Sequence, residues 1–228
     1  FFLGSFQGFM GWFMVESGLV NKPDVSHFRL SAHLVTAFVI YALLLNAFWN
    51  NLNKNNHRYT VKNVSKRYGK NLFYLKLSIF MVFLTISSGA FVSGTNAGWA
   101  YNNFPYMGDN FLPPILLNEE TKDFNTLFND IGFLQFFHRI LATLSLIIIS
   151  FTLIGIFKNK VLKDSYKIFT LLLLMIFLQY ALGIIALITF VPLSVGLAHQ
   201  LGSLIVLTLL IISLNELKKK GRLSAPNL

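Results

Sequence analysis

The stretch Leu134–Phe157, LQFFHRILATLSLIIISFTLIGIF, decides the fold. It carries no charged residue after Arg139, and as an α-helix it is long enough to cross a hydrocarbon core of about 30 Å. Its apolar residues are continuous and do not alternate with polar ones, which favours a helix over a strand of a β-barrel. The stretch therefore predicts a membrane-spanning helix with a histidine, His138, near one end.

Other apolar runs flank this stretch on both sides, and we expect six spans in all. The spans cover residues 1–19, 29–49, 72–94, 134–157, 166–191 and 195–214. Only 12% of the residues are charged, whereas a soluble domain carries about 25%. The sequence thus predicts an all-α protein, a polytopic transmembrane helical bundle in a lipid bilayer. The absence of cysteine excludes disulfides, thiolate metal sites and cysteine-based catalysis.

Charge divides the connections between spans into two kinds. The segments 50–71 and 158–167 and the C-terminal tail are basic, whereas segment 95–133 is acidic with Lys122 as its one basic residue. Basic connections face the cytoplasm or the mitochondrial matrix, so segment 95–133 faces outward. The net charge of +10 is explained by this topology, and we expect no nucleic-acid partner.

The outward segment ends in an amphipathic pattern. Phe124, Leu127, Phe128 and Ile131 fall on one stripe of a helix. We expect a short helix there, lying on the outer membrane surface and leading into the span at 134–157.

Three spans each carry a histidine near the outer end: His33, His138 and His199. All three spans run from outside to inside, so the imidazoles lie in one layer of the membrane. A single such histidine can simply hydrogen-bond a neighbouring helix, but three ionisable side chains at one depth favour a functional site. Neutral imidazole is a good ligand for haem iron, and helix bundles hold such cofactors between their helices. We therefore expect the three histidines to be metal ligands.

A weak internal repeat pairs each histidine with the span that precedes it. The units are Gln7 and Gly11 with His33, Gln179 and Gly183 with His199, and in part Gly89 with His138. These glycines, together with Gly94, either let a bulky ring approach the backbone or allow close helix packing in lipid. The sequence leaves both interpretations open.

Other polar residues near the outer ends also have two interpretations. Arg139 either pairs with a haem propionate or extends towards the interface. His27 is interpreted as a solvated or phosphate-facing side chain, and Glu16 as a carboxylate at a helix end without an assigned role. His57 lies in the basic loop and is expected to take no part in a site.

Several motifs in order along the chain resemble one family, the heme A synthases in their cysteine-free alphaproteobacterial and mitochondrial form. The motifs are Gln7–Leu19 (QGFMGWFMVESGL), Val25–Leu34 (VSHFRLSAHL), Gly89–Gly94 (GAFVSG) with Ala97 and Gly98, Tyr101–Pro105 (YNNFP), Gln135–Arg139 (QFFHR) and Leu197–Gln200 (LAHQ). The likeness covers nearly the whole chain.

The resemblance implies eight spans in two pseudo-symmetric four-helix halves. Residues 1–71 would be the remainder of the N-terminal, substrate-haem half, with two spans. Residues 72–228 would be the complete C-terminal, haem b half with a basic tail. The first helix pair would precede Phe1, and with it a Glu-x-x-His-Arg stretch whose Glu is the family's presumed catalytic acid-base group. No catalytic residue is therefore assigned within the chain, which as given is expected to be incomplete and inactive.

The resemblance also implies a role for each histidine. His138 and His199 would be the axial ligands of haem b, with Arg139 beside them, and His33 would bind the substrate haem O. Gln135 stands where the other half has its Glu, and an amide cannot take up a proton as a carboxylate does. This difference fits a cofactor role for the C-terminal half.

The activity implied is that of an oxidoreductase, which oxidises a methyl group of haem O to formyl and gives haem A for cytochrome oxidase. Haem O synthase would deliver the substrate, in the inner membrane of a bacterium or of a mitochondrion. A homo-oligomer is compatible with the sequence, which defines no electron acceptor.

Two other functions remain open at this point. One is a membrane-bound diheme b-type cytochrome that acts only as an electron carrier, although such proteins typically place haems on both sides of the membrane. The other is a transporter or assembly factor with structural histidines, which would bind no haem.

Overall fold

The computed structural model describes residues 1–16, 25–52, 61–118 and 123–223. Within these residues the protein is helical and contains no strand, which confirms the all-α prediction. The long helices are α1 (Phe2–Val15), α2 (His27–Leu52), α3 (Val61–Gly94), α6 (Ile131–Phe157), α7 (Tyr166–Ile188) and α8 (Leu193–Leu223). Short helical turns lie between them: η2 (Ala97–Trp99), α4 (Pro114–Leu117), α5 (Phe124–Asn129) and η3 (Lys160–Ser165).

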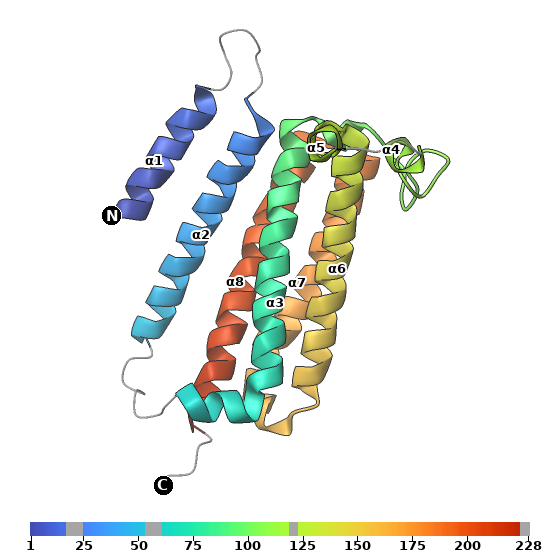
Figure 1. Ribbon diagram of the computed structural model, residues 1–228. Coiled ribbons are helices and arrows are strands. Elements are labelled where there is room, and N and C mark those ends of the chain that lie inside the picture. Colours follow the sequence, from blue (N-terminus) through green and yellow to red (C-terminus); the bar gives the residue numbers. More distant parts are fainter. Residues whose placement is uncertain (17–24, 53–60, 119–122, 224–228) are drawn as a thin grey trace.

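The helices α3, α6, α7 and α8 form a compact group, and α2 and then α1 are added to one side of it (Figure 1). The group has its own apolar core, in which α3 contributes Leu75, α6 Leu153, α7 Phe169 and α8 Leu207 and Leu210, each at most 1% exposed. Helix α2 packs against α3 and α8, whereas α1 packs against α2. The C-terminal four helices are therefore the packed body on which the histidine-bearing ends are held.

Five helices are long and apolar enough to span a membrane, as expected: His27–Leu52, Tyr68–Gly94, Ile131–Phe157, Leu162–Ile188 and Leu193–Lys220. The expectation of six spans needs a correction at the N-terminus. Helix α1 has 14 residues and so extends about 21 Å, less than a hydrocarbon core of about 30 Å. Residues 17–19, the predicted end of that span, lie outside the described residues.

Helix α3 begins earlier than its apolar content indicated. The segment 50–71 was expected to be a loop, but from Val61 onwards it is helical, while residues 53–60 lie outside the described part. The helix bends at Tyr68, whose backbone leaves the helical region at φ −122° and ψ 16°. The part before the bend lies across the inner end of the bundle (Figure 1). Apolar periodicity marks only the lipid-crossing part, so it could not reveal this extension.

Polar contacts join the helices inside the apolar layer. The hydroxyl groups of Tyr41 on α2 and Thr208 on α8 lie 2.7 Å apart. Nearer the inner end of the same pair, the amide of Asn215 donates to Asn46 Oδ1 at 3.1 Å. Contacts of this kind contribute about 0.6 kcal/mol each in membrane proteins, and here they fix α2 in register with α8.

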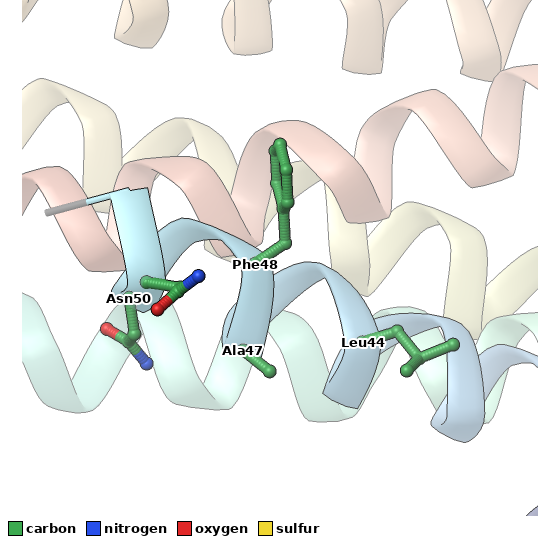
Figure 2. A pocket seen from close by; sticks show the side chains of 5 residues that line it. Leu44, Ala47, Phe48 and Asn50 are labelled. Atoms are coloured by element: carbon green, nitrogen blue, oxygen red, sulfur yellow. The ribbon is translucent and has the colours of Figure 1, made fainter. Parts of the chain in front are cut away.

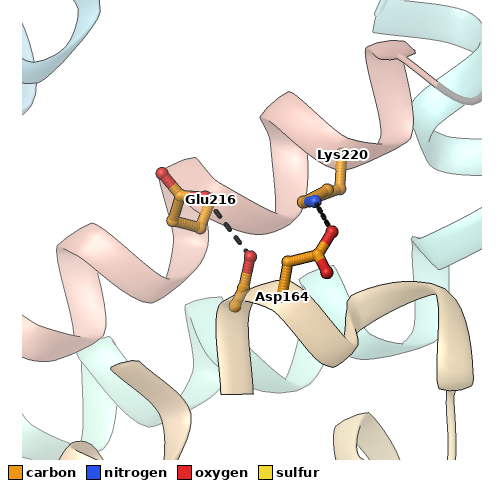
Figure 3. A network of polar contacts seen from close by, with 4 residues as sticks. Asp164, Glu216 and Lys220 are labelled. Atoms are coloured by element: carbon orange, nitrogen blue, oxygen red, sulfur yellow. Dashed lines mark hydrogen bonds and ion pairs between the residues drawn. The ribbon is translucent and has the colours of Figure 1, made fainter. Parts of the chain in front are cut away.

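The inner ends of α7 and α8 are linked by a small polar network (Figure 3). Lys220 on α8 donates to Asp164 in η3 at 2.7 Å, and Ser165 donates to Glu216 at 3.4 Å. Asp164 is 81% exposed, so this ion pair contributes little to stability. Its effect is to place the turn before α7 against the end of α8.

The amphipathic helix expected on the outer surface is present but shorter than predicted. Helix α5 ends at Asn129, and Ile131 already belongs to α6. Asp130 separates them, because its carboxylate accepts a hydrogen bond from the backbone N–H of Phe133 at 2.7 Å and so begins a new helix. Phe128 is packed against Phe133 and Phe137 of α6.

Replacing this helix cap tests the fold of the outer segment. Asp130→Ala removes the acceptor for the Phe133 N–H and is expected to lower the free energy of unfolding by about 1 kcal/mol. Asp130→Asn keeps an acceptor oxygen and should change it by only a few tenths of that amount. Thermal unfolding in detergent, followed by circular dichroism, measures both, and equal losses in the two variants would contradict the capping role.

Candidate functional site

The three histidines occupy the same place on three parallel helices. His33, His138 and His199 lie six or seven residues after the first residues of α2, α6 and α8, which are His27, Ile131 and Leu193. Figure 1 shows these three helices running in the same direction through the bundle. The structure therefore supports the predicted common depth.

Each histidine lies against a glycine of the long helix before it. A methyl group added at Gly183 would lie 2.9 Å from Cε1 of His199. The corresponding distances are 3.1 Å between Gly89 and His138 and 3.2 Å between Gly11 and His33. In all three cases the nearest ring atom is Cε1, so the repeat seen in the sequence is a repeated packing arrangement.

Gly94 allows close packing of two helices, the second interpretation that the sequence left open for these glycines. A methyl group there would lie 2.9 Å from Cβ and 3.1 Å from Cα of His27. Gly94 therefore allows the first turn of α2 to approach the end of α3 closely. The ring of His27 packs on Phe28 and Phe91, with centroid distances of 4.4 and 5.6 Å.

The rings of His138 and His199 face each other across the gap between α6 and α8. Their centroids are 6.4 Å apart and their planes meet at 83°. Two imidazoles bound on opposite sides of one iron would have centroids about 6.4 Å apart, since each Fe–N bond is about 2 Å and each centroid lies about 1.2 Å beyond its nitrogen. The separation of the two rings thus fits a shared iron.

The hydrogen bonds of Ser88 define which nitrogen of His138 is free. The Ser88 hydroxyl donates to the Thr85 carbonyl at 2.8 Å, and its oxygen lies 2.9 Å from Nδ1 of His138. Because the single hydroxyl proton is used, Ser88 accepts from Nδ1–H. The lone pair of the neutral ring is then on Nε2, the arrangement typical of a metal-ligating histidine.

His199 has a different partner. The amide nitrogen of Gln179 donates to the backbone carbonyl of His199 at 2.8 Å and lies 3.2 Å from Nδ1 of the ring. The amide oxygen of Gln179 is buried and has no hydrogen-bond partner among the described residues. The Gln179 atom that faces Nδ1 is thus a donor, and the amide oxygen lies against Gly202. A proton on Nδ1, as metal binding at Nε2 requires, would need this amide to turn.

The surroundings of His33 repeat this arrangement on α1 and α2. The amide nitrogen of Gln7 donates to the His33 carbonyl at 3.2 Å and lies 3.2 Å from Nδ1, but it also lies 3.3 Å from Nε2. The Gln7 amide oxygen is buried and has no hydrogen-bond partner within the part of the chain that the structure describes. Arg29 fixes α1 to α2, since its guanidinium donates to the Phe13 carbonyl at 2.8 Å and lies 3.8 Å from the centre of the Phe13 ring. No feature of the sequence indicated this contact between Arg29 and Phe13.

These observations together test whether the site fits a haem. Two imidazoles at a suitable separation, with Nδ1 of His138 bonded to Ser88 so that its Nε2 is free, fit axial coordination of a porphyrin iron, which needs only two protein ligands. Among the described residues there is no group of three or more His, Asp or Glu side chains suited to a metal ion bound by protein alone. The donor set therefore fits haem.

Arg139 has other partners than the one expected. Its two terminal nitrogens donate to the carbonyls of Tyr101 at 2.9 Å, Tyr106 at 3.0 Å and Pro105 at 3.4 Å, and to Gln135 Oε1 at 3.2 Å. Gln135 in turn donates to the Tyr101 carbonyl at 3.1 Å. Arg139 and Gln135 thus hold the outer segment 101–106 against α6, and pairing of Arg139 with a propionate stays a prediction.

A hollow on the surface lies away from the histidines. It has a volume of about 540 Å³ and is lined by Leu44, Ala47, Phe48, Asn50 and Asn51 near the inner end of α2 (Figure 2). Ala47 is about 21 Å along the helix from His33, so this hollow takes no part in the histidine site. Glu16 is exposed at the end of α1, and His57 lies outside the described residues.

The protein is therefore a polytopic membrane protein. Its long apolar helices bring two imidazoles, those of His138 and His199, together near their outer ends. Comparison with known proteins identifies its family. The chain belongs to the COX15-CtaA family, described as cytochrome oxidase assembly protein, whose model matches residues 1–211.

Curated relatives of this chain carry one name. It is 40% identical over 224 residues to the heme A synthase of Nitrosospira multiformis, which covers 96% of this chain and 60% of the relative. The heme A synthase of Rickettsia prowazekii is 38% identical over 90% of this chain and 58% of the relative. The chain thus spans about three fifths of the length of these relatives. No solved structure matches significantly.

Removing the Arg139 contacts should loosen the outer segment. Arg139→Gln replaces a guanidinium that forms four hydrogen bonds, and amide hydrogens between residues 101 and 107 are expected to exchange at least about tenfold faster. Hydrogen exchange with mass spectrometry measures this change. Arg29→Gln, which removes a guanidinium bound to Phe13 instead, is the matched control and should leave these amides unchanged. Unchanged exchange in Arg139→Gln would show that other contacts hold the segment.

Proposed function

We propose that this protein acts in heme A synthesis, oxidising a methyl group of haem O to a formyl group. The curated relatives are named heme A synthases, and the site offers the two axial ligands that a resident haem requires. The observation that carries the proposal is the opposed pair His138 and His199, with ring centroids 6.4 Å apart.

In this proposal the resident group is haem b, held by His138 and His199. Ser88 accepts the Nδ1 proton of His138, which leaves the lone pair on Nε2 for the iron. Gln179 supports His199 through the backbone carbonyl. Haem b, when bound, supplies one-electron transfer, while the chain orients the two ligands and shields them between α6, α7 and α8.

His33 is the proposed ligand for the substrate, haem O. It lies on α2, outside the four-helix group, and among the described residues the side chain facing it is the amide of Gln7 rather than a second imidazole. Haem O synthase is the proposed source of this substrate.

The alternative, a diheme b-type cytochrome that only carries electrons, needs haem ligands near both faces of the membrane. The four histidines within the described residues all lie in the first turns of α2, α6 or α8 at the outer end. This distribution favours chemistry on one side of the membrane. We place the protein in a bacterial inner membrane or the mitochondrial inner membrane.

Histidine variants test the assignment of haem b. His138→Ala and His199→Ala each remove one of two axial ligands and should eliminate the six-coordinate low-spin haem b spectrum of the purified protein. His33→Ala should keep that spectrum, because His33 lies at the other site, and His57→Ala in the basic loop is the neutral control. Optical spectra and pyridine haemochrome extracts measure the result. A haem b spectrum that survives loss of His138 or His199 would contradict the assignment.

The proposed reaction is tested by following the pigments. Cells that lack their own heme A synthase and produce haem O should form haem A when they also produce the protein together with the Glu-x-x-His-Arg stretch that the family resemblance implies, as measured by chromatography of extracted haems. His33→Ala should lower the haem A yield at least about tenfold, because the substrate loses its ligand, while haem b content stays normal. Haem A formation that is independent of both His33 and the His138–His199 pair would refute the proposed reaction.

A further inference from the structure

We infer that Gly11, Gly89 and Gly183 are positioning residues that set the orientation of the haem-ligating imidazoles. This inference rests on the proposed function, since it concerns how the same histidines meet their haems. These three residues are called the histidine-facing glycines below. None of them would touch a haem iron, and each acts through the imidazole that lies on it.

The contact is specific to these glycines. A methyl group at Gly8, one turn before Gly11 on the same helix, would have no neighbour within 4 Å. At Gly155 on α6 the nearest atom would be Asn71 Oδ1 at 3.7 Å, an ordinary contact. Only at the histidine-facing glycines is the nearest atom Cε1 of an imidazole, and it recurs on three helix pairs. General helix packing would not select the same ring atom three times.

The imidazoles cannot simply move away from an added methyl group. On the side of Nδ1, His138 meets Ser88 at 2.9 Å and His199 meets Gln179 at 3.2 Å. Each ring is thus placed between a glycine at its Cε1 edge and a polar partner at Nδ1, which leaves the Nε2 edge for iron. Packed interiors transmit such displacements instead of absorbing them, so an alanine would rotate the ring about its Cβ–Cγ bond or shift it.

The quantity that these glycines control is the angle between the two imidazole planes, which is 83° in this structure. Nearly perpendicular axial imidazoles leave the iron d orbitals almost degenerate, and a low-spin ferric haem then gives a strongly anisotropic electron paramagnetic resonance spectrum. Parallel planes remove the degeneracy and give a rhombic spectrum. The orientation of the rings can therefore be read directly from the haem, independently of catalytic activity.

The test compares Gly183→Ala and Gly89→Ala with Gly155→Ala in the full chain loaded with haem b. In the wild type and in Gly155→Ala we expect the strongly anisotropic ferric signal. In Gly183→Ala, where the added carbon would meet Cε1 at 2.9 Å, we expect a less anisotropic signal and about tenfold to a hundredfold weaker haem binding. Gly89→Ala should show the same changes to a smaller extent, because its distance is 3.1 Å.

A variant that only unfolds is recognised by its circular dichroism and melting temperature, and alanine should if anything favour the helix. If Gly183→Ala does not fold, the milder Gly89→Ala decides the test. Folded variants with the wild-type signal and affinity would overturn the inference and leave the haem b assignment intact. A wild type that binds no low-spin haem would instead overturn the proposed function, and the inference with it.

Gly11 is tested through the proposed haem O site at His33. Gly11→Ala, compared with Gly8→Ala on the same helix, should lower the haem O retained by the purified protein by about tenfold. Equal retention in both variants would overturn the inference for Gly11.

Discussion

An imidazole inside a lipid bilayer must find all its partners within the protein, and the outer half of this structure is built around that constraint. Each of the three intramembrane histidines receives a polar partner near Nδ1 and a glycine at Cε1. At His138 and His199 the polar partner lies on the Nδ1 side, whereas at His33 the Gln7 amide nitrogen also lies 3.3 Å from Nε2. For His138 and His199 these rings approach each other at a separation suited to one iron, so the partners that make burial tolerable also leave a nitrogen free to bind.

The positions of the ligands depend on a rigid body beneath them. The apolar core between α3, α6, α7 and α8 contains side chains with almost no exposure, such as Leu153 and Phe169. Helix α2 is attached to this body by polar pairs, among them Tyr41 with Thr208, and among the described residues α1 packs against α2. His138 and His199 are therefore carried by helices of the core, and His33 by a helix at its edge. This difference agrees with the proposal of a resident haem at one site and a substrate at the other.

Sequence reasoning predicted the helical class, the direction of the spans and the common depth of the histidines, because apolar length, loop charge and position along a span determine these properties. It also found the glycine repeat, but not its purpose, since spacing does not say which ring lies against which backbone. The partners of His138 and Arg139 were missed for a related reason. Ser88 can be recognised as the partner of His138 only once α3 is known to lie beside α6. The carbonyls that Arg139 binds belong to an irregular segment without periodicity. The position of Ser88 immediately before Gly89 was the one available signal.

The outer segment between α3 and α6 is held by hydrogen bonds that a molecule crossing it would have to break. Trp99 donates to the Phe190 carbonyl at 3.1 Å, and Asn102 donates to the Leu187 carbonyl at 2.8 Å, so the segment is tied to the end of α7 as well as to Arg139 on α6. In the proposed function, a haem that approached across this part of the segment would have to break these hydrogen bonds together, so the bonds slow exchange of the haem from this side.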